Sequence, residues 1–176
     1  KIGLESMEPF MLLGLRFLLA FGFLGILFWR QLRGVGWSTW WKSILLGGVL
    51  FCVMGCELLG LQTVSSSMAS FLENTAIVFV PLFEAVLSRQ WPRREDLAVS
   101  GIILIGVALL VLSPGSLADG ITIGTAYCLL AAVLYAGWIL LTGCSVREEP
   151  PLAIGILSLG VVGILSMGAA LLFEYA

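Results

Sequence analysis

Residues 9–29 read PFMLLGLRFLLAFGFLGILFW, and Arg16 is the single charged side chain in this run. An α-helix needs about 20 consecutive apolar residues to cross the ~30 Å hydrocarbon core of a bilayer. This run has that length and composition, and it exceeds the ~7–15 residues of a signal-peptide core. It therefore predicts a membrane-spanning helix.

Five further apolar runs raise the prediction to six spans. After the first span at Pro9–Trp29 they cover residues 43–61, 66–87, 97–112, 121–143 and 152–173. Of the whole chain, 60% is apolar and 11% is charged, whereas soluble domains carry about 25% charged residues. None of the connecting loops is long enough to hold a soluble domain. The predicted fold class is an all-α, polytopic transmembrane helical bundle in contact with the lipid bilayer.

The basic residues predict the orientation. Seven of the nine lie in the first, third and fifth loops, namely Arg30, Arg33, Lys42, Arg89, Arg93, Arg94 and Arg147. Because Lys and Arg stay preferentially on the cytoplasmic side, we expect these loops to face the cytoplasm and the chain to start outside. A plasma membrane and an organelle membrane both fit this pattern.

Several classes of chemistry are disfavoured by composition. Histidine is absent, which removes the commonest metal ligand and general base. Cys52 and Cys56 share a helix face, but without His or a second Cys pair they indicate buried thiols rather than a metal site. A membrane enzyme would need clustered Asp, His or Lys, and the only aspartates are Asp96 and Asp119. We expect no metal, cofactor, disulfide framework or nucleic-acid partner, and no enzyme activity.

Ionisable side chains inside the predicted spans are the best pointers to function. Each costs at least ~2.5–3.5 kcal/mol at a helix centre unless it is compensated. Counting ~1.5 Å per residue, Arg16, Glu57 and Glu73 share a depth in the outer half of the bilayer. Glu84 lies near the cytoplasmic end.

The third predicted span carries a polar stripe. Spacings of 4, 3 and 11 place four of its residues in a narrow arc at 100° per residue: Ser66, Ser70, Glu73 and Glu84. One interpretation is that the stripe lines a solute cavity, and the other is that Arg16 pairs with Glu73 or Glu57 only to hold helices together. On the first interpretation the substrate-binding residues are Glu73, Asn74, Ser70, Ser66 and Arg16.

Glycines in the fourth and sixth spans indicate close helix packing, because small residues let helix backbones approach each other. They are Gly101, Gly106, Gly155, Gly160, Gly163 and Gly168. An internal repeat is also indicated, since residues 9–14 (PFMLLG) resemble residues 151–155 (PLAIG). Five spans separate the two starts, so the related helices run in opposite directions, as in an inverted-topology repeat.

Several segments in a fixed order resemble one known family. Residues 61–72 read LQTVSSSMASFL and residues 78–82 read VFVPL, while RREDL at 93–97 precedes GIILIGV at 101–107. LRF at 15–17 and the stretch from Gly124 to Ala136 add to the pattern. Together these segments are similar to the EamA-type members of the drug/metabolite transporter superfamily, over nearly the whole chain.

The resemblance implies ten helices in two inverted five-helix repeats, with the six spans corresponding to helices two to seven. Residues 1–115 are then most of the first repeat, with four spans, and residues 116–176 are the start of the second, with two. Because the chain opens with Lys1 and ends in or just after an apolar run, we expect it to be part of a longer protein.

The function implied by the resemblance is alternating-access transport of a small metabolite, an amino acid or related solute, by a proton-coupled or facilitative route. Family members usually carry Pro where Ile77 stands, Asp where Thr125 stands, and an acidic residue near Arg89. These departures leave open a non-transporting or degenerate membrane subunit of the same fold. A second copy of the chain, in a homodimer, is a further expected partner beside the small-molecule substrate.

Overall fold

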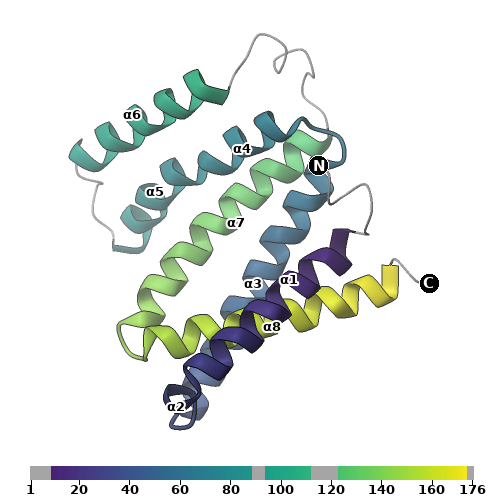
Figure 1. Ribbon diagram of the computed structural model, residues 1–176. Helices are drawn as coiled ribbons and strands as arrows, with labels where there is room; N and C mark the ends of the chain where they lie inside the picture. The colour runs from purple at the N-terminus through teal and green to yellow at the C-terminus, as the bar shows by residue number, and fades with distance from the viewer. Residues whose placement is uncertain (1–8, 89–93, 112–122, 174–176) are drawn as a thin grey trace. The chain divides into compact units, whose positions relative to one another are not determined.

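The computed structural model of the chain describes residues 9–88, 94–111 and 123–173 (Figure 1). Within these ranges the regular structure is α-helical and contains no strand. The helices are α1 (Pro9–Leu27), α2 (Trp29–Leu32), α3 (Trp37–Leu61), α4 (Ser66–Asn74), α5 (Ala76–Ser88), α6 (Arg94–Val111), α7 (Ile123–Val146) and α8 (Pro151–Phe173). The prediction of an all-α, polytopic membrane bundle is confirmed.

Five segments of the described chain are long and apolar enough to cross a membrane. They are Phe10–Leu27, Trp37–Leu61, Ser66–Leu87, Ile123–Val146 and Pro151–Leu172. Each coincides with a predicted span. The remaining predicted span, 97–112, corresponds to α6, whose described apolar stretch is the shorter Leu97–Gly106, and residue 112 lies outside the described residues. Large apolar side chains such as Ile26 and Leu109 are exposed on these helices, which suits a surface covered by lipid.

Helix α3 begins at Trp37, earlier than the predicted start at Ser43. The prediction placed the start of the helix directly after the charged Lys42, but the helix begins before Lys42 and includes it. Trp37 and Trp41 stand one turn apart with ring centroids at 6.0 Å and an interplanar angle of 87°. Tryptophan rings favour the headgroup layer of a bilayer. This aromatic turn therefore carries the helix beyond the purely apolar run.

The third predicted span is two helices rather than one. Helix α4 ends at Asn74 and α5 begins at Ala76. Between them the Thr75 N–H donates to the Leu72 carbonyl at 3.1 Å, and the Val78 N–H donates to the Thr75 carbonyl at 3.0 Å. Both bonds span three residues, which is the tighter 3₁₀ spacing. The Thr75 hydroxyl also donates back to the Phe71 carbonyl at 3.2 Å, a bond that commonly bends a helix.

Helix α5 contains Pro81, which has no N–H to donate. The carbonyl of Ile77, four residues earlier, therefore lacks its usual helical partner. The Ser100 hydroxyl of α6 donates to this carbonyl at 3.5 Å, and Ser100 itself is buried. Serine and threonine on neighbouring helices often satisfy such freed carbonyls in membranes. The bond joins α6 to α5 where the hydrogen-bond ladder of α5 is interrupted.

The chain divides into two compact units, residues 1–51 with 142–176, and residues 52–141. Helices α3 and α7 contribute to both. In the first unit α8 packs against α1 (Figure 1). A Cβ on Gly14 would lie 3.0 Å from the Met167 backbone nitrogen, and one on Gly163 would lie 2.8 Å from Leu18. Small residues at these points bring the two helix backbones together.

Helix α3 approaches α8 in the same way in this unit. A Cβ on Gly47 would lie 2.6 Å from the Val161 Cβ and 2.9 Å from the Ser158 carbonyl oxygen. The prediction of packing glycines is confirmed at Gly160, which faces the Phe21 ring, and at Gly163. It is wrong for four others, which meet no described atom within 4 Å: Gly101, Gly106, Gly155 and Gly168.

In the second unit the end of α3 packs against the start of α7. Gly60 faces Cys128 and the Gly124 carbonyl, while Gly124 in turn faces Thr63 and Val64. Further along α7 a small-residue core receives aromatic rings from α5. This core consists of Ala76, Ala132 and Ala136, with Phe79, Val80, Phe83 and Tyr135 packed against it. Helix α7 therefore contacts α3 near its start and α5 further along.

Candidate substrate-binding site

Four of the predicted substrate-binding residues lie on α4, in the second unit. Ser66 and Ser70 are exposed, whereas Glu73 and Asn74 are half-buried. The helix starts at a side-chain cap, because the Ser65 hydroxyl accepts a first-turn backbone N–H at 3.4 Å. The Asn74 amide nitrogen donates to the Ser70 carbonyl at 2.7 Å, which ties that side chain to its own helix.

Glu84 is separated from the rest of the polar stripe by the break at Thr75. It lies on α5 and is exposed. The predicted arc assumes one continuous helix from Ser66 to Glu84, and the tighter turn at Thr75 changes the phase between its two halves. Only the stripe residues between Ser66 and Asn74 therefore lie on one continuous helix.

The structure brings Glu73 together with Glu57, a pairing that the sequence reasoning missed. Glu57 lies on the last part of α3, and the two half-buried carboxylates interact electrostatically. Cys128 on α7 lies within the electrostatic influence of both. The depth band that Glu57 and Glu73 share in the sequence was the available signal, but the sequence interpretation paired them with the opposite charge of Arg16 instead.

This acidic pair has little opposing charge in its own unit. In the described part of residues 52–141 the sequence contains one basic side chain, Arg94, exposed at the first residue of α6. Two neighbouring carboxylates disfavour each other's ionised form, and each charge is costly inside hydrocarbon. The pair is therefore suited to taking up protons or a cationic group.

Arg16 lies in the first unit, on α1, and its side chain is exposed. Among the described residues it forms no ion pair. Because Glu57 and Glu73 belong to the other unit, a link between Arg16 and either carboxylate stays a prediction.

A second polar cluster joins the start of α3 to the loop between α7 and α8, within the first unit. Lys42 Nζ lies 2.5 Å from Glu148 Oε2 and 3.7 Å from Glu149 Oε1. The buried Thr39 hydroxyl donates to Glu149 Oε2 at 2.6 Å. Hydrogen bonds from Thr39 and then Ser38, together with the charge of Lys42, lower the pKa of Glu149.

No group of three or more His, Cys, Asp or Glu that could hold a metal ion occurs among the residues the structure describes. Cys52 and Cys56 are free thiols, as are Cys128 and Cys144. Cys52 is exposed and Cys56 is half-buried on α3.

Comparison with known proteins identifies the family. The model of the EamA-like transporter family matches residues 1–112, which include α1 to α6. The chain belongs to the EamA-like transporter family. This EamA-like chain is also 35% identical over 111 residues to a protein named "Uncharacterized transporter" from Archaeoglobus fulgidus. That match covers 60% of the chain and 38% of the relative, so the chain spans well under half of that protein. No solved structure matches the chain.

The family and the membrane-spanning helices agree on the class of protein. The chain is an integral, multi-pass membrane protein of a transporter family, and the names of the family and the relative describe transporters rather than enzymes. The family match covers the helices that carry both Arg16 and the Glu57–Glu73 pair.

Proposed function

We propose that the chain is part of an alternating-access transporter of amino acids or related small metabolites. We further propose that Glu57 and Glu73 receive the ammonium group of the solute. The observation that carries the proposal is the interacting pair of half-buried carboxylates inside two predicted spans.

The charge balance supports a cationic ligand. Two ionised carboxylates in hydrocarbon cost at least ~5–7 kcal/mol together at the per-residue cost of ~2.5–3.5 kcal/mol. The described part of their unit offers one basic side chain, Arg94, at an exposed helix start. An ammonium group between Glu57 and Glu73 would offset this cost, and protons would do so when the site is empty. Exchange of protons for solute is the proton-coupled form of the proposal.

The remaining predicted residues supply polar contacts. Ser66 and Ser70 present exposed hydroxyl groups on the helix that carries Glu73. Asn74 uses its amide nitrogen within α4, which leaves its carbonyl oxygen as a further acceptor. Arg16, predicted from the sequence as a substrate-binding residue of the first span, stays a proposed ligand for a charged group of the solute. Residues 1–115 and 116–176 are proposed as parts of two inverted repeats that form the cavity between them.

Flux measurements on charge-neutral variants test this proposal. The chain in its full-length protein is reconstituted into liposomes, and uptake of a panel of radiolabelled amino acids is measured. Each amino acid is also offered as a competitor in its N-acetylated form, which lacks the ammonium charge. We expect Glu73→Gln and Glu57→Gln to lower flux at least tenfold, and the N-acetylated competitors to inhibit far less than the free amino acids.

Glu84→Gln is the matched control, because it removes a carboxylate of the same predicted span outside the pair. Membrane insertion of every variant is checked by protease accessibility of the loops. Normal flux in Glu73→Gln would refute the assigned site. Loss of insertion would assign Glu73 to folding, and absence of flux in the unsubstituted protein for every solute would favour a non-transporting subunit.

A further inference from the structure

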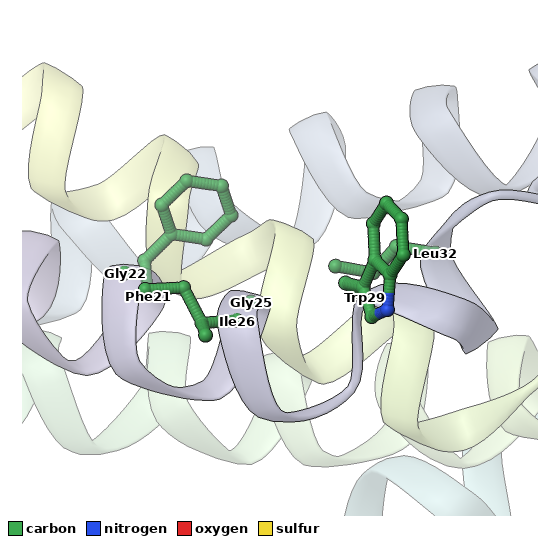
Figure 2. Close-up of a pocket in the computed structure, with 6 residues that line it drawn as sticks. All are labelled: Phe21, Gly22, Gly25, Ile26, Trp29 and Leu32. Atoms are coloured by element: carbon green, nitrogen blue, oxygen red, sulfur yellow. The ribbon is translucent and has the colours of Figure 1, made fainter.

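A shallow apolar hollow of about 530 Å³ lies at the end of α1 in the first unit. It is lined by Phe21, Gly22, Gly25, Ile26, Trp29 and Leu32 (Figure 2). Phe21 and Ile26 stand at one end, and Trp29 and Leu32 stand at the other. The hollow is a feature of a continuous stretch of chain and needs no contact with the second unit.

Two glycines create this hollow. A Cβ on Gly22 or Gly25 would meet no described atom within 4 Å, so neither glycine serves close packing of described helices. From Phe21 to Leu27, where α1 ends, the helix rises about 9 Å at ~1.5 Å per residue. One leaflet of a bilayer has about 15 Å of hydrocarbon, half of the ~30 Å core. The part of the hollow on α1 therefore runs along somewhat more than half the depth of one leaflet.

Positive charge is concentrated at one end of the hollow. The Arg33 guanidinium carbon stands 3.5 Å from the centre of the Trp29 ring. Arg30 follows Trp29 directly, and both arginine side chains are exposed. A guanidinium stacked by its face keeps its N–H edges available, and these match the oxygens of a phosphate group.

We propose that this hollow is a binding site for one anionic phospholipid. The phosphate lies against Arg30 and Arg33, and an acyl chain lies over Gly22 and Gly25 between Phe21 and Trp29. Anionic lipids are concentrated in the cytoplasmic leaflet, where they attract basic segments next to membrane spans. The distribution of basic residues predicts that this end of α1 is cytoplasmic, which places the site in that leaflet.

The charge arrangement favours a lipid over another helix as the occupant. A helix packed along α1 would use the apolar hollow but would not account for two exposed cations at its cytoplasmic end. A phospholipid has an apolar chain and an anionic headgroup in the same order as the hollow and its arginines. The exposed Trp29 ring at their junction occupies the headgroup boundary, where tryptophan is enriched.

Native mass spectrometry of the full chain in detergent tests the site. Dioleoyl phosphatidylglycerol and dioleoyl phosphatidylcholine are added separately, so that only the headgroup differs. We expect one phosphatidylglycerol to be retained in preference to phosphatidylcholine. In Arg30→Gln/Arg33→Gln the affinity for phosphatidylglycerol should fall about 30-fold, at roughly fivefold per arginine near the headgroups. Gly25→Leu fills the hollow and should weaken both lipids.

Two control variants separate this site from general effects. Arg94→Gln/Arg147→Gln removes the same charge elsewhere, and Gly101→Leu adds the same side chain at another glycine with open space. Both should bind phosphatidylglycerol normally. Equal retention of the two lipids, or equal losses in the control variants, would overturn the proposal. Dissociation of a dimer by Gly25→Leu with no change in lipid binding would assign the hollow to a protein partner and would also overturn it.

Discussion

Replacing Gly47 with alanine tests how tightly α3 and α8 are packed. The new methyl group would lie 2.6 Å from the Val161 Cβ and 2.9 Å from the Ser158 carbonyl oxygen. Neither atom can move by side-chain rotation, because a Cβ is bonded directly to the backbone and the Ser158 carbonyl is part of it, so the two helices must separate. Overpacking of this kind costs about 1–3 kcal/mol.

Gly48→Ala is the matched control, because the neighbouring glycine meets no described atom within 4 Å. Alanine is favoured over glycine inside a helix by about 0.8–1 kcal/mol, so this variant should keep or gain stability. With about 2–4 °C per kcal/mol for a chain of this size, Gly47→Ala should melt roughly 2–12 °C below Gly48→Ala.

Circular dichroism at 222 nm during heating in detergent measures both variants, with chemical unfolding as an independent check. The expected order of Tm is Gly48→Ala, unsubstituted chain, Gly47→Ala. If Gly47→Ala melts at the same temperature as Gly48→Ala, α3 and α8 do not meet at Gly47 and the reasoning is refuted. If Gly48→Ala loses as much as Gly47→Ala, the loss reflects any added methyl group rather than the contact.

Two further predictions follow from side-chain hydrogen bonds. Ser100→Ala leaves the freed Ile77 carbonyl without its donor and should lower the free energy of unfolding by about 0.5–1.5 kcal/mol in chemical unfolding. In a Pro81→Ala background, where the backbone N–H returns, the same change should cost almost nothing. Equal costs in both backgrounds would contradict the assignment. Because the folded pKa of Glu149 is lowered, its contribution to stability is present above its ordinary pKa and is lost as the pH falls through the folded value. In Thr39→Val, which removes the largest cause of that shift, melting between pH 6 and pH 3 should show a smaller dependence on pH below about 4.5, and an unchanged pH profile would count against the bond.

The membrane fold was predictable because its signal is local. A run such as residues 9–29 must be helical wherever it meets lipid, since no other partner exists there for its backbone groups. The ends of α1 and α8 accordingly fall within about two residues of their predicted bounds. The break at Thr75 was not predictable in the same way. Neither glycine nor proline marks it, and Pro81, the expected breaker, lies inside α5.

The candidate site was predictable in its residues but not in its pairing. The cost of charge in hydrocarbon singled out Glu57 and Glu73 individually, yet which carboxylate meets which neighbour depends on how α3, α4 and α7 pack. The polar link from Lys42 to Glu148 was missed for the same reason, because the two residues are distant in the sequence and neither stands in a distinctive sequence pattern. Glycine spacing was equally ambiguous: Gly163 packs tightly, while Gly168 on the same helix has open space.

The packing of α1 on α8 can form only late in the synthesis of this chain. Gly14 contacts Met167, so a helix near the start of the chain depends on one near its end. At about 5–20 residues per second, a ribosome needs roughly 8–30 s to produce the chain between them. During that time α1 is in the membrane without its partner, with Gly14 and Leu18 uncovered. Early truncation products would expose this surface, which gives quality-control proteases a way to distinguish them from the finished bundle.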